Sequence, residues 1–171
     1  MELEKAKMIA EKLKALLESS CERITIAGSI RRQKPEVKDI ELLVIPKYIA
    51  GVDMLDAKIQ TLIELEVLDY RLNKLGSKVY GAKNKLMLDR LTGIGVDVFS
   101  TTEDCWAVSL VVRTGGKITN QRIAMAAIMK GWHLKAYGSG FSTPQGDIVC
   151  RSERDVFEFV GLPYKEAWER E

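Results

Sequence analysis

The spacing of apolar residues changes along the chain from helical to strand-like and back, and this pattern predicts the order of the elements. Residues 3–17 carry apolar side chains at intervals of three and four residues, which predicts an opening helix. Residues 23–27 alternate in polarity and are rich in β-branched side chains, so they predict a strand that runs into Gly28. A second strand is expected over residues 39–45, where Pro46 stops it.

The middle of the chain predicts one helix and three short strands. Asp53 precedes apolar residues at helical spacing, and we expect it to cap a helix over residues 54–66. Strands are expected over residues 67–72, 85–91 and 96–100, because these segments are short and apolar and have glycines between them. Strands and helices in this order indicate an α+β domain with a mixed sheet.

The character of the sequence changes near Thr101. Thr101 and Asp104 match a capping box, in which side chains satisfy the free N–H groups at a helix start, and they predict a helix over residues 106–112. A Thr-Gly-Gly break at residues 114–116 then precedes a second helix, which is expected over residues 118–130.

The last part of the chain predicts short elements. Residues 137–146 are rich in turn formers, residues 147–150 predict a short strand, and a capping motif at residues 152–155 predicts a final helix. We therefore expect an α+β protein with two parts. A mixed-sheet domain with flanking helices would occupy residues 1–101, and a smaller helix-and-strand lobe would occupy residues 102–171.

Composition excludes several classes of protein. The 171 residues have 46% apolar content and a net charge of only +2, so bulk charge does not predict nucleic-acid binding, although a local basic patch stays open. Cys21, Cys105 and Cys150 lie far apart and form no CxxC pair, which predicts a reduced, intracellular protein without structural zinc or disulfides. There is no signal peptide and no apolar run near the ~18 residues of a membrane span, so we expect a soluble, cytoplasmic protein.

Three carboxylates give the strongest chemical signal. Asp39 and Glu41 stand two residues apart in a predicted strand, so their side chains point to the same face. Asp97 is the only charged residue between Gly93 and Ser100, and a lone carboxylate in such an apolar strand is costly. Acidic oxygens on neighbouring strands suit hard cations, and two-metal phosphoryl or nucleotidyl transfer requires them. A solvated edge strand is the alternative for Asp39 and Glu41, but it does not explain Asp97.

A Gly-Ser step and an arginine suggest a phosphate site before the first acidic pair. Gly28 lets the backbone approach a phosphate, Ser29 adds a hydroxyl and an N–H group, and Arg32 offers a planar fork of donors. Ten residues separate Ser29 from Asp39, which is enough for a hairpin that brings both to one end of the sheet. An ordinary turn with solvated arginines is the alternative.

The Thr114-Gly115 break and Asn120 have two interpretations that both stay open. The break is either a tight bend between helices or exposed backbone beside a nucleotide's sugar, with Asn120 one turn later at the base edge. No nucleophile motif and no Walker-type Gly-Lys-Ser/Thr occurs, so any chemistry must come from metal ions.

Several segments occur in an order and spacing that point to a known family. They are Gly28-Ser29-Ile30-Arg31-Arg32, Asp39-Ile40-Glu41-Leu42-Leu43, Val96-Asp97-Val98, Arg113-Thr114-Gly115-Gly116 with Asn120, Lys130-Gly131-Trp132, Tyr137, and Asp155-Val156-Phe157 through Gly161-Leu162-Pro163-Tyr164. This ordered set resembles the family X DNA polymerases (the polymerase beta group), and it covers nearly the whole chain.

The resemblance implies a nucleotidyltransferase palm over residues 1–101 and a nucleotide- and DNA-binding lobe over residues 102–171, acting as a monomer. It implies two bound Mg²⁺ ions, with Mn²⁺ as a substitute. The implied roles are metal binding and catalysis for Asp39, Glu41 and Asp97, triphosphate binding for Gly28, Ser29 and Arg32, and contact with the sugar or base for Thr114, Gly115 and Asn120.

The function implied by the resemblance is Mg²⁺-dependent transfer of a nucleotide from a dNTP (or NTP) to a nucleic-acid 3′-hydroxyl. The expected acceptor is a DNA primer/template or gapped DNA, as in repair synthesis. Transfer to RNA, to a protein or to a small molecule stays open, and so does a module that binds nucleotide or DNA without chemistry. We expect no counterpart here of the lyase and helix-hairpin-helix modules of the animal enzyme. The chain therefore resembles the minimal viral-type member, of weak expected processivity.

Five residues depart from the family's pattern. Glu41 stands where the polymerases usually have Asp, and Val112-Arg113 replaces an aromatic pair that commonly screens the sugar. Phe99 replaces an arginine and Ala136 replaces a glutamate, both of which take part in lobe closure in the animal enzyme. Metal preference and the choice between deoxyribose and ribose are therefore left open.

Overall fold

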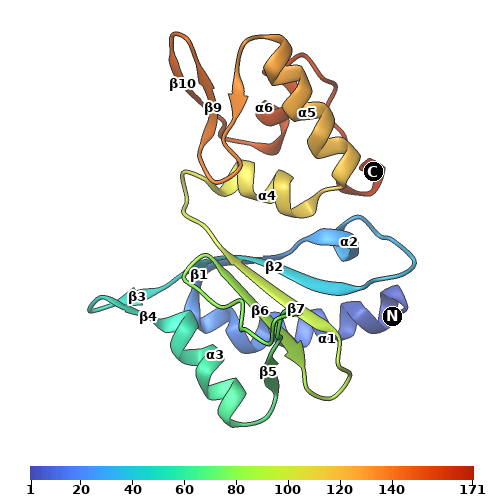
Figure 1. Cartoon of the computed structure of the whole chain (residues 1–171), viewed down its shortest axis with the longest axis vertical. Helices are drawn as coiled ribbons and strands as arrows, with labels where there is room; N and C mark the ends of the chain where they lie inside the picture. Colours follow the sequence, from blue (N-terminus) through green and yellow to red (C-terminus); the bar gives the residue numbers. More distant parts are fainter.

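The computed structural model describes residues 1–171, which form two lobes stacked along the longest axis of the molecule (Figure 1). The helices are α1 (Leu3–Leu17), α2 (Gly28–Arg31), α3 (Met54–Glu64), α4 (Trp106–Thr114), α5 (Lys117–Met129) and α6 (Glu153–Glu158), with 3₁₀ turns at Glu18–Ser20 and Ala167–Glu169. The strands are β1 (Cys21–Ile26), β2 (Asp39–Pro46), β3 (Tyr48–Ile49), β4 (Val52–Asp53), β5 (Leu68–Tyr70), β6 (Asn84–Asp89), β7 (Gly95–Ser100), β8 (His133–Leu134), β9 (Gly140–Thr143) and β10 (Gly146–Val149).

The N-terminal lobe is built on a five-stranded sheet in the order β1-β2-β7-β6-β5. β2 and β7 run parallel, whereas the other neighbouring strands run antiparallel. The connection between the parallel strands is long and contains α3, β5 and β6, as a crossover between parallel strands must be. The predicted α+β fold with a mixed sheet and flanking helices is therefore confirmed.

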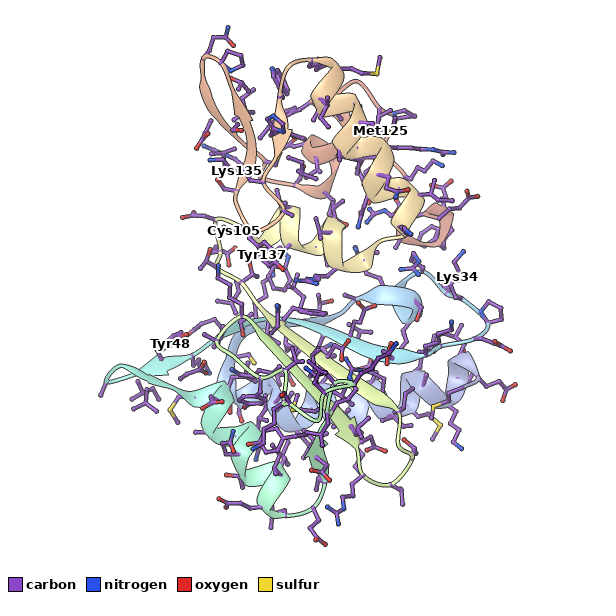
Figure 2. All side chains as sticks on the ribbon, viewed as in Figure 1. Lys34, Tyr48, Cys105, Met125, Lys135 and Tyr137 are labelled. Carbon is purple, nitrogen blue, oxygen red and sulfur yellow. The ribbon has the colours of Figure 1, made fainter.

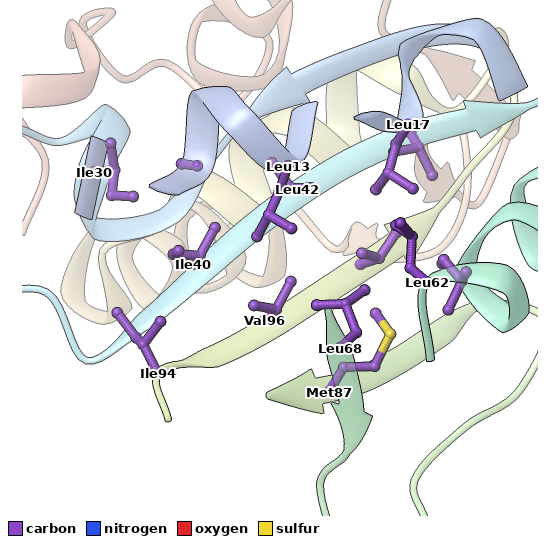
Figure 3. Packing of buried hydrophobic residues seen from close by; sticks show 14 of the residues in the cluster. Leu13, Leu17, Ile30, Ile40, Leu42, Leu62, Leu68, Met87, Ile94 and Val96 are labelled. Carbon is purple, nitrogen blue, oxygen red and sulfur yellow. The ribbon is translucent and has the colours of Figure 1, made fainter. Parts of the chain in front are cut away.

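The main hydrophobic core lies on the face of this sheet that α1 and α3 cover (Figure 3). Ile40 and Leu42 of β2 and Val96 and Val98 of β7 are fully buried there. Because side chains of a strand alternate between faces, the residues between these apolar positions point to the opposite face. That face is turned toward the C-terminal lobe (Figure 1).

The C-terminal lobe has a smaller core of its own. Helices α4, α5 and α6 and a three-stranded antiparallel sheet in the order β10-β9-β8 surround nine buried residues, among them Val108, Ile123 and Phe157. The two cores lie on either side of the boundary that the sequence predicts between residues 101 and 102. The division into two domains stays a prediction.

Two of the three predicted helix caps are confirmed. The side chain of Asp53 accepts a hydrogen bond of 3.0 Å from the backbone N–H of Asp56 at the start of α3. Ser152 and Asp155 form a reciprocal capping box at the start of α6. Each cap satisfies N–H groups that the first helical turn leaves without a partner.

The capping box predicted at Thr101 and Asp104 is wrong. α4 begins at Trp106, and no side chain caps it. The backbone N–H of Thr101 donates instead to the carbonyl of Val44, so Thr101 still belongs to the sheet and lies too far upstream to cap the helix. Its hydroxyl lies 2.8 Å from the hydroxyl of Ser109, which joins the end of the sheet to α4.

The sequence pattern does not predict two pairs of short strands. β3 and β4 form a hairpin that turns at Ala50 and Gly51, both of which have positive φ. β8 pairs with β9, which lies inside the segment predicted as turns. Strands of two to four residues are too short to display a period of polarity.

Three charged side chains hold the two lobes together. Glu153 of α6 accepts hydrogen bonds of 2.6 and 2.9 Å from Arg31 of α2 and one of 2.8 Å from Arg170. Arg31 also donates to the hydroxyl of Thr114, at 2.7 Å. Burial alone would raise the pKa of Glu153, but the hydrogen bonds and positive charges of the two arginines lower that pKa below its usual value. Charge-assisted bonds therefore fix how α2 meets the C-terminal lobe.

No helix of the structure combines the length and the apolar character that are needed to cross a lipid bilayer.

Removing Glu153 is expected to destabilise the protein strongly. E153A leaves the guanidinium of Arg170, which is fully buried, without its carboxylate partner. Breaking a buried ion pair from one side costs about 3–5 kcal/mol, and chemical denaturation would measure this loss in the free energy of unfolding. Because the folded pKa of Glu153 is lowered, its contribution is complete above the unfolded pKa and fades as pH falls through the folded value.

Glu158 on the same helix provides the matched control. Its pair with Arg154 is exposed on both sides, so E158A is expected to cost less than about 0.5 kcal/mol. Equal losses for E153A and E158A would contradict the role given to the buried triad.

Candidate functional site

Three carboxylates lie on the sheet face that is turned toward the C-terminal lobe. In the parallel pairing of β2 with β7, Glu41 stands opposite Asp97, and Asp39 stands opposite Gly95. Neighbouring strands are about 4.8 Å apart, so the backbones of Glu41 and Asp97 are as close as two strands allow. Asp97 is buried, and the other two acids are half-buried. The structure thus brings the three acidic residues of the sequence hypothesis together.

The three side chains do not converge on one point. The carboxylate of Glu41 lies directly over the α-carbon of Gly28, where any added Cβ would overlap Oε2 of Glu41. Asp39 and Asp97 instead turn toward Arg71, which contacts both of them. No group of three or more Asp, Glu, His or Cys side chains is arranged here as a ready set of metal ligands.

Burial and mutual repulsion make this acidic cluster energetically unfavourable. Burial, and next the charge of Asp97, raise the pKa of Glu41 to about 7, while Arg32 and Arg113 oppose the rise. Burial also raises the pKa of Asp97 to about 6, an effect that Arg71 opposes and that Asp39 adds to. Additional positive charge between the carboxylates would relieve both costs.

The residues present fit a divalent ion. Carboxylate oxygens are the donors that Mg²⁺ and Mn²⁺ prefer. Oδ1 of Asp97 is buried, and its 2.7 Å contact with Nη2 of Arg71 is poorly aligned for a hydrogen bond, so this oxygen has charge attraction but no well-placed donor. An oxygen in that condition is suited to accept a cation.

A polar cavity lies beside the acids. It has a volume of about 730 Å³, and its wall consists of Ser29, Arg32, Lys34, Pro35, Glu36, Lys38, Asp39 and Glu41. The sequence prediction that the Gly-Ser step and the acidic strand meet at one end of the sheet is confirmed. Three cationic and three acidic side chains line this space, and such a mixture suits a ligand that carries both phosphates and metal ions.

Arg32 joins this cavity to the C-terminal lobe. Its Nη1 atom donates a short hydrogen bond to the carbonyl of Thr114, while Nε is buried without a partner. Burial lowers the pKa of Arg32, and the charge of Glu41 opposes that change. Arg32 therefore keeps unused donor capacity next to the acids.

The residues of the C-terminal lobe that were predicted to contact a nucleotide form hydrogen bonds and contacts with other parts of the chain. Thr114 is fully buried, and its hydroxyl and carbonyl accept from Arg31 and Arg32. Nδ2 of Asn120 donates to the carbonyl of Val112 at 2.9 Å, whereas Oδ1 of Asn120 is buried without a partner. Gly115 has a φ of +73° and lies against the guanidinium of Arg32. Contact of these residues with a sugar or base stays a prediction.

Sequence reasoning missed Arg71, Lys34 and Lys38. Arg71 follows β5 and has no spacing relation to the acidic motifs, so only the folded sheet brings it to them. Lys34 and Lys38 lie in the loop between α2 and β2, and their place between the phosphate motif and Asp39 could have identified them. Figure 2 shows Lys34 on this loop, on the opposite side of the molecule from Tyr48 of the β3–β4 hairpin.

Comparison with known proteins identifies the C-terminal part of the chain. Residues 109–171 match the family model of the DNA polymerase beta thumb. A search of curated protein sequences finds no match. The whole chain is similar in structure to Leishmania infantum polymerase beta in a ternary P/T complex, with a TM-score of 0.81 and 20% identity over 100% of this chain and 76% of the other. A ternary gap complex of the same Leishmania protein gives a TM-score of 0.80 and 19% identity over 100% and 70%.

The chain therefore has the fold of a polymerase beta, and its residues 109–171 match the model of the polymerase beta thumb. Two of its departures from the family pattern lie against each other in this polymerase-like fold. The guanidinium of Arg113 stacks 3.7 Å from the ring centroid of Phe99, so the residue that replaces an aromatic contacts the residue that replaces an arginine. Arg113 also lies within 3.5 Å of Asn84 and 3.4 Å of the hydroxyl of Tyr137. A cation of the thumb thereby sits close to the acids of the sheet.

The raised pKa of Glu41 predicts a pH-dependent cost in stability. Below the unfolded pKa the carboxyl is neutral and costs nothing; the cost grows as pH rises above the unfolded pKa and is complete above the folded value of about 7. We expect E41Q to be more stable than the wild type by about 1–3 kcal/mol at pH 8 and to lose that advantage near pH 4.5. Chemical denaturation at several pH values, in buffer that contains a chelator, measures the difference.

E36Q removes the same charge from an exposed position on the same cavity and serves as the control. Its effect on stability is expected to stay within about 0.5 kcal/mol at every pH. An advantage of E41Q that does not change with pH would argue against a buried, strained carboxylate at this position.

Proposed function

We propose that the chain is a divalent-metal-dependent nucleotidyltransferase that transfers a nucleotide from a dNTP to the 3′-hydroxyl of DNA. The observation that carries the proposal is the pairing of Glu41 with Asp97 on adjacent strands, with Asp39 beside them, at the edge of the cavity that holds Arg32. The similarity in fold to a polymerase beta in ternary P/T and gap complexes supports primer/template and gapped DNA as acceptors.

Asp39, Glu41 and Asp97 would hold the divalent ions, Mg²⁺ or Mn²⁺, that this reaction uses. Bound ions would activate the attacking hydroxyl and neutralise the departing pyrophosphate. Asp97 is mostly ionised above pH 7, since its pKa is about 6, and it can accept the proton of the attacking hydroxyl. Its buried position on a central strand holds that base rigidly.

Ser29 and Arg32 would bind the triphosphate, and we extend this subsite to Lys34 and Lys38. Both lysines line the same cavity as Ser29 and Arg32. Neither forms an ion pair within the chain, in contrast to Arg31, which is paired with Glu153. A triphosphate carries three to four negative charges at neutral pH, so several cations without partners improve its binding, each as a point charge on a flexible stem.

The thumb would complete the site from above the sheet. Thr114 and Gly115 contact Arg32, so a triphosphate bound at Arg32 would leave its sugar near this bend and its base toward α5. Asn120 on α5 has a buried Oδ1 atom free to accept a hydrogen bond. On this proposal residues 1–101 act as the palm and residues 102–171 as the thumb.

Primer extension tests the proposal directly. Purified protein with Mg²⁺ or Mn²⁺ is expected to extend gapped or recessed primers, and D97N is expected to lower kcat by at least about 100-fold while the fold and nucleotide binding persist. No incorporation of dNTP or NTP on gapped, recessed or single-stranded primers would reject the polymerase function. Activity on single-stranded primers alone would favour a template-independent transferase.

Replacing the two lysines is expected to weaken nucleotide binding more than chemistry. K34A and K38A should each raise KM for dNTP by about two- to fivefold with little change in kcat, and the double variant should multiply these effects, because exposed cations contribute modestly to phosphate binding. Lys12 on the outer surface of α1 provides a control of equal charge. A KM for K34A/K38A equal to that of K12A would place the lysines outside the triphosphate subsite.

A further inference from the structure

Arg71 lies between two acids that come from different strands. Its Nη1 atom is 3.2 Å from Oδ1 of Asp39, and its Nη2 atom is 2.7 Å from Oδ1 of Asp97. The side chain is 28% exposed, so solvent reaches it without surrounding it. One guanidinium thus bridges the only two carboxylates of the trio that turn away from Gly28.

The backbone of Arg71 is anchored so that the side chain must cross the sheet. Its N–H group donates to the carbonyl of Leu86 on β6, and Leu86 pairs directly with Asp97 of β7. The extended side chain therefore passes over β6 and ends above β7. This placement follows from the antiparallel order of β5, β6 and β7, which sequence spacing does not reveal.

Gly95 makes the room that the bridge occupies. A Cβ atom at this position would overlap both Oδ1 of Asp39 and Nη1 of Arg71. The ion pair to Asp39 therefore sits in the volume where a side chain of β7 would otherwise lie. The φ angle of Gly95 is not in the left-handed region, so glycine is needed here for space and not for backbone conformation.

We propose that Arg71 is a positioning residue that competes with a divalent cation for Oδ1 of Asp39 and Oδ1 of Asp97. Both are positive groups that require the same two oxygens, so an ion that uses these oxygens binds only as the guanidinium withdraws. Arg71 thereby lowers the affinity of the acids for metal and offsets the repulsion between Asp39 and Asp97. This inference rests on the proposed function, because it assumes that the acids bind metal.

The competition predicts an unusual result, namely that removing a residue of the site strengthens binding. R71A is expected to bind Mn²⁺ about three- to tenfold more tightly than the wild type, since one partly exposed ion pair no longer opposes the ion. The measurement is the fall in the free Mn²⁺ EPR signal during titration, without nucleotide or DNA. D97N, which removes a shared oxygen charge, is expected to weaken binding at least about tenfold.

R90A gives the matched control. Arg90 is nearly half exposed and pairs with Glu66 and Asp69, which do not belong to the acidic cluster, so R90A changes the net charge equally without touching the shared oxygens. Its affinity for Mn²⁺ is expected to equal that of the wild type within twofold. R71K keeps the charge but loses the fork, and it is expected to bind Mn²⁺ more tightly than the wild type and less tightly than R71A.

Weaker or unchanged Mn²⁺ affinity in R71A would overturn the inference, because Arg71 would then organise the acids without opposing the ion. Equal gains in R71A and R90A would also overturn it, since the cause would be general charge. If R71A fails to fold, as judged by circular dichroism, the comparison of R71K with the wild type decides in the same way. A wild type that extends primers while R71A shows no gain refutes only this inference; a wild type that neither extends primers nor binds Mn²⁺ refutes both.

Discussion

The repulsion among three carboxylates on one sheet face is the constraint around which the rest of this molecule is arranged. Parallel pairing of β2 with β7 sets Glu41 against Asp97, and neither strand can shift by one residue without turning its apolar side chains out of the main core. The acids are therefore held close by hydrophobic packing on the far face of the sheet. Arg32, Arg71 and Arg113 reach this cluster from three different segments and partly neutralise it. A folded chain tolerates such a cluster at a cost in stability that sites of chemistry commonly carry.

Two glycines complete this arrangement, because a side chain at either position would overlap a charged group of the cluster. Gly28 leaves space for the carboxylate of Glu41, and Gly95 leaves space for the contact between Asp39 and Arg71. Only Gly28 also has a positive φ, so the two positions require glycine for partly different reasons. The additional methylene of Glu41 relative to aspartate is accommodated over Gly28, which explains how the departure from the family pattern fits the fold.

Much of the fold was accessible from sequence because long elements display their period. α1, α3, α5 and the five strands of the main sheet all lie where apolar spacing predicted them, and alternation in β2 alone indicated that Asp39 and Glu41 share a face. Failures occurred where tertiary contacts overrule local patterns, as at Thr101, whose N–H is taken by Val44 of the sheet. Arg71 could not be predicted, because its relation to the acids depends on the strand order. Contact of Asn120 and Thr114 with a nucleotide stays a prediction, and bonds to the chain's own backbone and arginines occupy most of their polar atoms.

Arg31 and Arg32 are consecutive residues that bind Thr114 at two different atoms. Arg31 donates a hydrogen bond to its hydroxyl, and Arg32 donates one to its carbonyl. A ligand that draws the guanidinium of Arg32 toward itself would break the hydrogen bond from Arg32 to Thr114. The bond from Arg31 would remain, because Glu153 holds the guanidinium of Arg31 in place. The contact between the lobes therefore has two parts: the bonds of Arg31, which a ligand at Arg32 would leave intact, and the bond of Arg32, which such a ligand would break. Movement of the thumb on such a joint would be a limited tilt about Arg31 rather than a free separation of the lobes.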